Sequence, residues 1–207
     1  MKTIVFQGDS ITDATYPRQY PTELGNGYVT ITAGRVTYDY PGKYQCFNRG
    51  ISGNRSVDLY ARIKKDVLNL KPDILTVLIG VNDVWHEFES NDGVSVEKYV
   101  KILKMFLQEV RDERPDCHIF LMEPFVLEGT ANAAFFTEFS HEVYKRAAAC
   151  KAVAQELDIP FIPLQEKISA LAAATNNAYV LHDGVHPTSA GHYLISQELY
   201  KTMEPVL

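Results

Sequence analysis

Serine, histidine and aspartate side chains that could act together occur in two short motifs near opposite ends of the chain. Ser10 ends Gly-Asp-Ser at residues 8–10, and Asp183 and His186 bound Asp-Gly-Val-His at residues 183–186. A serine hydroxyl is a weak nucleophile unless a base accepts its proton and a third group orients that base. With two residues between them, Asp183 can bind one ring nitrogen of His186 and leave the other for Ser10. The pattern predicts acyl transfer, with Ser10 as nucleophile, His186 as base and Asp183 as its acidic partner.

Two further motifs offer the hydrogen-bond donors that such a reaction needs. Attack on an ester creates an oxyanion, and each preorganised donor to it contributes about 10²–10³ in rate. Gly53 ends the segment 48–53, and Asn82 lies in Gly-Val-Asn-Asp at residues 80–83. We expect the oxyanion hole to consist of the backbone amides of Ser10 and Gly53 and the side-chain amide of Asn82. Each motif alone is also typical of an ordinary turn, so this interpretation depends on their joint occurrence.

The elements that must position these motifs alternate along the chain. Short apolar runs typical of buried strands lie at residues 3–6, 44–47, 74–79, 119–122 and 161–162. Helices are predicted at residues 57–70, 96–110, 138–157, 164–174 and 190–203, the first two from apolar residues three and four positions apart. Strands and helices in turn predict an α/β protein with a parallel sheet.

The carboxyl edge of this sheet is the expected location of the site. The three glycine-containing motifs directly follow the first three predicted strands, and the histidine motif directly precedes the last predicted helix. Segments without predicted elements, from residue 9 to about 28 and from 81 to about 95, follow the first and third strands. Long loops in compact domains are often functional, and ligands of open parallel sheets bind beyond the carboxyl ends of the strands.

Composition excludes several classes of protein. The 207 residues, of which 46% are hydrophobic and 22% charged, predict one globular domain over residues 1–207. A net charge of −6 argues against a nucleic-acid partner. No apolar run approaches the roughly 18 residues of a membrane span, and the apolar stretch at the start is too short for a signal peptide. Three widely spaced cysteines are typical of free thiols, so we expect a cytoplasmic protein with no membrane association.

The four motifs together resemble the signature blocks of the GDSL-type or SGNH hydrolases, over residues 3 to about 200. The blocks are matched by residues 8–10, 48–53, 80–83 and 183–186. The resemblance implies a flavodoxin-like three-layer α/β/α sandwich with a central, mostly parallel five-stranded sheet. It also implies ester hydrolysis through an acyl-serine intermediate, with no metal and no cofactor. Residues 48–54, 79–85 and 183–192 look most like the small intracellular carbohydrate acetylesterases, including acetylxylan esterases, which implies an acetylated sugar as substrate.

Five residues near the motifs are candidates for substrate binding. Aromatic and polar side chains commonly line ligand pockets, and the candidates are Asp9, Trp85, His86, Tyr16 and Tyr20. Packing in the core is the competing interpretation for the tyrosines. A group of phenylalanines after the fourth strand could form a lid, a core patch or the contact of a homo-oligomer, and it comprises Phe125, Phe135, Phe136 and Phe139.

Three alternatives remain beside the acetylesterase. His182, Asp183, His186 and Asp9 have the ligand types of a metal-dependent phosphohydrolase, although Ser10 stands where a ligand would be expected. A non-enzymatic binding module would be expected to have lost Ser10, Asp183 or His186. A lysophospholipase or thioesterase of the same family would need an elongated apolar groove for its acyl chain.

Overall fold

The computed structural model describes residues 1–15, 19 and 23–207 and contains one five-stranded sheet. The strands are β1 (Lys2–Gly8), β2 (Tyr44–Gly50), β3 (Ile74–Leu78), β4 (His118–Met122) and β5 (Phe161–Ile162). Their order is β2-β1-β3-β4-β5, and neighbouring strands run parallel. The five strands predicted from the sequence are therefore confirmed.

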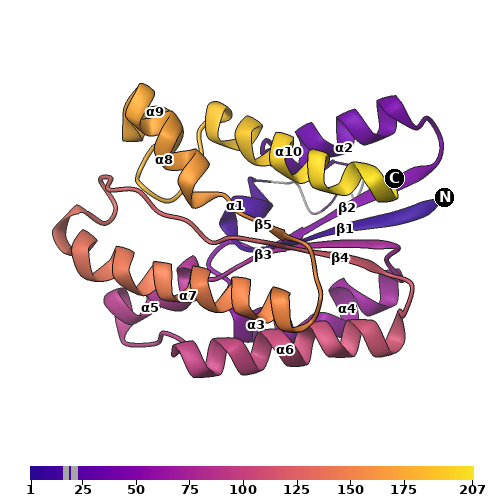
Figure 1. Ribbon diagram of the computed structural model, residues 1–207, viewed down its shortest axis with the longest axis horizontal. Helices are drawn as coiled ribbons and strands as arrows, with labels where there is room; N and C mark the ends of the chain where they lie inside the picture. Colours follow the sequence, from indigo (N-terminus) through magenta and orange to yellow (C-terminus); the bar gives the residue numbers. More distant parts are fainter. Residues whose placement is uncertain (16–18, 20–22) are drawn as a thin grey trace.

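Helices cover both faces of the sheet (Figure 1). One face carries α2 (Tyr28–Asp39), α8 (Gln165–Ala174), α9 (Asn177–Val180) and α10 (Ser189–Met203). The other carries α3 (Ser56–Ala61), α4 (Ile63–Asp66), α5 (Val81–Ser90), α6 (Val96–Glu113) and α7 (Phe136–Glu156). The short helix α1 (Ser10–Asp13) follows β1, and single 3₁₀ turns occur at Leu68–Leu70, Ala133–Phe135 and Glu204–Val206. The expected α/β/α sandwich is confirmed.

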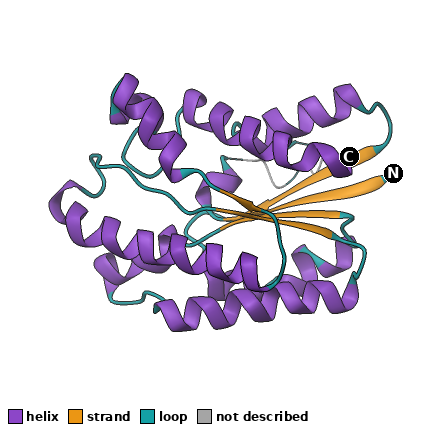
Figure 2. Cartoon of the chain, in the orientation of Figure 1, coloured by secondary structure: helices purple, strands orange, loops and turns teal. Residues whose placement is uncertain are grey.

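Side chains of the strands pack alternately into two cores, as the period of a strand dictates. In β1, Ile4 and Phe6 join the cluster that includes residues of α2 and α10, whereas Val5 joins the cluster with α3 and α6. In register, Gly8 at the end of β1 pairs with Gly50 on one side and Leu78 on the other. The segments after β1, β2 and β3 therefore start side by side, at the sheet edge where loops and short helices gather in Figure 2.

Several elements differ from the sequence-based expectation. The expected loop 81–95 is largely helix α5, because Gly80, with φ of 139°, turns the chain sharply after β3 and the apolar side chains of Val81, Val84 and Trp85 share one helix face. The expected helix 57–70 is broken into α3, α4 and a 3₁₀ turn, with Arg62 at the first break. The sequence pattern predicts none of the helices α1, α2 and α9, and α1 lies within the expected loop that begins at residue 9.

In the part of the chain that the structure describes, no helix is at once long enough and apolar enough to span a bilayer.

Candidate active site

Ser10, His186 and Asp183 form a continuous chain of hydrogen bonds. Ser10 Oγ lies 2.9 Å from Nε2 of His186, and Nδ1 of the same ring lies 2.7 Å from Oδ2 of Asp183. The second carboxylate oxygen, Oδ1, accepts the backbone N–H groups of Val185 at 2.9 Å and His186 at 2.8 Å. The carboxylate is thus fixed by its own turn, and it in turn fixes the orientation of the imidazole ring.

The turn that presents Asp183 and His186 is anchored to the loop after β4. Gly184 adopts φ of 100°, and its carbonyl oxygen accepts the N–H of Leu127 at 2.9 Å. A Cβ atom on Gly129 would lie 2.2 Å from the backbone carbon of Asp183, so the two segments pack backbone against backbone. Glycine is therefore required at residue 184 by the left-handed turn and at residue 129 by the close approach of the two backbones.

Hydrogen bonding separates the pKa values of the aspartate and the histidine. Burial by itself raises the pKa of Asp183, but the hydrogen bonds from the His186 ring and from two backbone N–H groups outweigh burial and hold this pKa below its usual range. The hydrogen bond to Asp183 raises the pKa of His186, and burial opposes it. Asp183 is therefore a carboxylate at neutral pH that stabilises a proton on His186.

Asn82 lies at the start of α5, where a buried network orients it. Its Nδ2 donates to the carbonyl oxygen of Asn54 at 3.1 Å, and an amide nitrogen carries a second hydrogen for a ligand. The adjacent Asp83 is fully buried and accepts hydrogen bonds from the backbone N–H and the hydroxyl of Ser56. Burial raises the pKa of Asp83 to about 6 despite these bonds. The turn after β2 and the start of α5 are thus joined at the sheet edge.

Gly53 lies in that turn with φ of 80°, and a Cβ on it would be 4.0 Å from Nε2 of His86. The preceding Ser52 donates its N–H and hydroxyl to Oδ2 of Asp13 at 3.0 and 2.8 Å, which ties the turn to α1. Ser10 is the first residue of the same helix α1. The three expected oxyanion donors therefore belong to segments that are linked by side-chain hydrogen bonds.

The structure places only some of the candidate substrate-binding residues near the site. Trp85 is half-buried, with its ring 6.2 Å from that of His186 and edge-on to Phe139 at 5.8 Å, and His86 lies beside Gly53. Tyr16 and Tyr20 lie outside the described residues.

Contrary to the expectation from the sequence, Asp9 cannot contact a substrate, because its side chain is buried, with 1% exposure. Oδ1 accepts the N–H of Ile11 at 3.0 Å, which caps helix α1, and Oδ2 has no partner among the described residues. Burial raises the pKa of Asp9 to about 7. Its residue type and place beside Ser10 suggested contact with a ligand, but its location at the end of a buried strand turns it inward.

A cavity of about 420 Å³ opens beside Ser10 and His186. Its lining also includes Asn26 and His192, for which the sequence analysis predicted no role. Asn26 precedes the unpredicted helix α2 and carries no signal in the sequence. The position of His192 does carry one, because α10 begins directly after the histidine motif and its first turn must lie near that motif.

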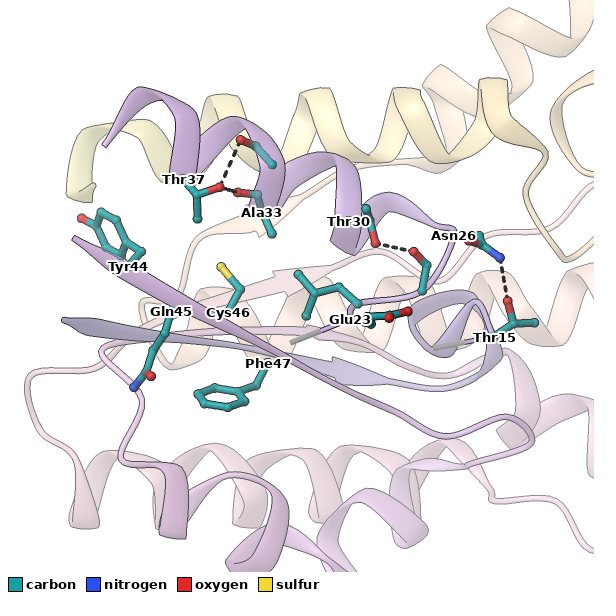
Figure 3. Close-up of a pocket in the computed structure, with 13 residues that line it drawn as sticks. Thr15, Glu23, Asn26, Thr30, Ala33, Thr37, Tyr44, Gln45, Cys46 and Phe47 are labelled. Atoms are coloured by element: carbon teal, nitrogen blue, oxygen red, sulfur yellow. Dashed lines mark hydrogen bonds between the residues drawn. The ribbon is translucent and has the colours of Figure 1, made fainter. Parts of the chain in front are cut away.

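A second cavity of about 730 Å³ lies between α2 and the edge strand β2 (Figure 3). Tyr44 and Cys46 point toward α2 in this view, whereas Gln45 and Phe47 point to the other side of the strand. Thr15 and Asn26 line both this cavity and the one beside Ser10, so the two spaces adjoin.

Fold and site together define an α/β hydrolytic enzyme, with polar groups gathered at the carboxyl edge of a parallel sheet. The model of the GDSL-like lipase/acylhydrolase family matches residues 6–194, and the chain belongs to this family. It is accordingly a carboxylic ester hydrolase, as the sequence motifs predicted.

Relatives with known names are similar over nearly the whole chain. An acetylxylan esterase of Geobacillus stearothermophilus is 31% identical over 94% of this chain and 90% of its own length. A solved structure of a GDSL-like lipase from Parabacteroides merdae superposes with a TM-score of 0.93 at 31% identity, covering 98% of this chain and 95% of the other. Axe2, an acetylxylan esterase from G. stearothermophilus, gives a TM-score of 0.87 at 29% identity, covering 98% and 94%. Catalytic mutants of Axe2 replace a serine, an aspartate or a histidine by alanine.

Proposed function

We propose that the protein is a serine esterase that removes acetyl groups from carbohydrates such as xylo-oligosaccharides, with Ser10, His186 and Asp183 as its catalytic triad. The observation that carries the proposal is the hydrogen-bonded series Ser10–His186–Asp183 in a chain 31% identical to an acetylxylan esterase. Every group that acyl transfer to a serine requires has a candidate at this edge of the sheet.

In the proposed reaction, Ser10 Oγ attacks the carbonyl carbon of the ester while its proton passes to Nε2 of His186. Asn82 and the backbone amides of Ser10 and Gly53 stabilise the resulting oxyanion. His186 then returns the proton to the sugar oxygen as the bond between that oxygen and the acyl carbon breaks, which leaves an acyl-serine. Water, deprotonated by His186, attacks the acyl-serine and releases acetate and the free Ser10 hydroxyl. Asp183 stabilises the imidazolium in both halves of the reaction.

The lining of the cavity beside Ser10 supports an uncharged, hydroxyl-rich alcohol group. Exposed Thr15, Asn26 and Ser52 contribute hydroxyl and amide groups to it, which suits a polyol. Outside this lining, the ring of Trp85 lies 6.2 Å from that of His186 and packs edge-on against Phe139. A long hydrocarbon chain would displace water from these exposed hydroxyl and amide groups and offer them no hydrogen bonds in return.

The test is release of acetate from acetylated xylo-oligosaccharides, with p-nitrophenyl acetate and octanoate in parallel. We expect rapid acetate release, a steep loss of rate from acetate to octanoate, and no effect of a chelator. The Ser10→Ala variant should retain less than about one per cent of the rate. Higher residual activity would overturn the role of Ser10, preference for octanoate would favour a lipid or thioester substrate, and dependence on added metal would favour a phosphohydrolase.

A further inference from the structure

His192 lines the same cavity as Ser10 and His186, although it belongs to the first turn of α10. Only 9% of this residue is exposed. Its ring lies nearly parallel to that of Tyr28, with 6.4 Å between the centroids and 24° between the planes. The side chain is therefore held between the last helix and the start of α2, with one part facing the cavity.

One ring nitrogen of His192 serves the fold. Tyr28 is the first residue of α2, and its N-cap residue, Gly27, makes no side-chain cap hydrogen bond. The N–H of Tyr28 donates instead to Nδ1 of His192 at 3.1 Å. Because a backbone N–H can only donate, Nδ1 must be unprotonated, and the proton of the neutral ring resides on Nε2.

The surroundings keep this ring neutral and in place. Burial, followed by the nearby His186 and His182, lowers the pKa of His192 to about 4. A Cβ on Gly27 would lie 2.8 Å from Cε1 of the ring and 2.6 Å from Cβ of Ala14, so glycine at this position makes room for the histidine. His192 is thus a fixed Nε2–H donor rather than a mobile or charged group.

The Nε2 atom is left for a ligand. Nε2 has no hydrogen-bond partner among the described residues. It is also not fully buried, in contrast to the unpartnered polar atoms inside the core. An accessible donor on a buried residue that lines a cavity must face that cavity. It therefore faces the space into which Ser10 and His186 also open.

We propose that Nε2–H of His192 binds an oxygen atom of the alcohol part of the ester, a hydroxyl or ring oxygen of the sugar. This inference rests on the proposed function. His186 must return its proton to the alcohol oxygen, and His186 and His192 line one cavity, whereas Asn82 and Trp85 are not part of its lining. A neutral N–H can donate to the uncharged oxygen of a sugar, and a site built to donate a hydrogen bond discriminates against alcohols that lack an acceptor.

Two amide variants distinguish the roles of the two ring nitrogens of His192. In His192→Asn the amide oxygen can occupy the place of Nδ1 and cap α2, but nothing reaches the place of Nε2. In His192→Gln the longer side chain can bring an amide N–H to the place of Nε2. For acetylated xylo-oligosaccharides we expect His192→Asn to raise KM about tenfold with little change in kcat, and His192→Gln to recover part of this loss. Both variants should change KM for p-nitrophenyl acetate less than KM for the sugar ester, because p-nitrophenol has no hydroxyl or ring oxygen of a sugar.

A purely structural role would give a different result. It predicts that His192→Asn matches the wild type, or that both variants lose activity on both esters in step with a loss of thermal stability. Either outcome would overturn the proposal. Long-range ¹H–¹⁵N NMR of the wild-type ring should show a proton on Nε2 at neutral pH, and a proton on Nδ1 would also contradict it.

Binding without turnover separates this inference from the proposed function. Calorimetric titration of acetylated xylo-oligosaccharide into Ser10→Ala should show binding that Ser10→Ala/His192→Asn weakens about tenfold. Equal affinity of the two variants would overturn the role of His192 while leaving the esterase proposal intact. If Ser10→Ala binds no sugar and the wild type cleaves only p-nitrophenyl acetate, the carbohydrate assignment fails and the role of His192 fails with it.

Discussion

The side-chain amide of Asn82 is held by the backbone of Asn54, whose carbonyl oxygen accepts its Nδ2–H at 3.1 Å. This bond joins the first turn of α5 to the turn after β2. It uses one of the two amide hydrogens of Asn82 and fixes the direction of the other. The donor proposed for the oxyanion is therefore oriented before a substrate arrives, which is the condition under which such donors contribute most to rate.

We predict that Asn82→Ala lowers kcat by about 10²–10³ and changes KM much less, because the donor acts on the charge that develops in the transition state. Steady-state kinetics with p-nitrophenyl acetate measure both constants. Asn82→Asp is a control of nearly identical shape that places an acceptor where the donor was, and it should be at least as inactive. A change in KM alone would instead assign Asn82 to ground-state binding.

Arg62 connects the ends of strands β1 and β2 to the turn after β2, which contains Asn54. Its guanidinium donates to the carbonyl oxygens of Gly8 at 3.1 Å and Arg49 at 2.7 Å, and to Oδ1 of Asn54 at 2.7 Å. An ion pair with Asp66 at 2.8 Å, with both side chains largely buried, holds the guanidinium in place.

We predict that Arg62→Ala destabilises the protein by about 3 kcal/mol, because Asp66 would lose its partner in a largely buried position. Loss of the bond to Asn54 should also loosen Asn82 and lower kcat more than it raises KM. Urea unfolding and kinetics at a temperature where the variant remains folded measure the two effects. Arg114→Ala, at a more exposed and longer ion pair with Asp73, is the matched control and should cost less than about 1 kcal/mol. Equal effects of the two variants would contradict the special role of Arg62.

The central strands could be predicted because they are short apolar runs in a sheet buried on both faces, as at Ile74–Leu78. Helices that carry site residues were harder to predict. In Val81–Ser90, Asn82 and Asp83 belong to a motif that is typical of a turn, so the sequence alone does not indicate the helical apolar face at Val84 and Trp85. At the break between α3 and α4, Arg62 donates hydrogen bonds to carbonyl groups at the ends of distant strands, and no local pattern in the sequence indicates such contacts.

The site was predictable where chemistry restricts the residue types, as for Ser10, Asp183 and His186, which the structure brings into hydrogen-bond contact. Residues that line the cavity are not restricted in this way. His192 and Asn26 reach it only because α10 and α2 pack against one another. Asp9 is the opposite case. Its place beside the predicted nucleophile Ser10 suggested contact with a ligand, but its side chain is buried and cannot make that contact.

The pH dependence of the reaction should follow His186. The hydrogen bond that the ring donates to Asp183 raises the pKa of His186 above its ordinary value of 6.5, and the base must be neutral to accept the proton of Ser10. We predict that kcat/KM falls tenfold per pH unit on the acid side, with a midpoint above pH 6.5. His192, whose pKa is about 4, titrates too low to produce this limb.

Asp183→Asn tests the origin of that limb. The substitution removes the negative charge and favours the wrong tautomer of His186, so we expect kcat to fall by about 10⁴ and the acid limb to move to lower pH. Initial rates measured from about pH 5 to 9 give both values. A wild-type rate that stays constant over this range would contradict the role of His186 as base.

Asp9 should make the folded protein less stable as pH rises. Burial raises its pKa from 3.8 to about 7, so between these values the folded state binds a proton that the unfolded state has released, and the free energy of unfolding falls with increasing pH. Asp9→Asn keeps an oxygen to accept the N–H of Ile11 but cannot titrate. Relative to the wild type it should therefore gain stability from pH 4 to 7.5, by up to about 4 kcal/mol. Urea unfolding at several pH values measures this difference, with Asp116→Asn, at an exposed carboxylate, as the control substitution. Parallel stability curves for the wild type and Asp9→Asn would mean that the buried carboxyl group does not titrate in this range.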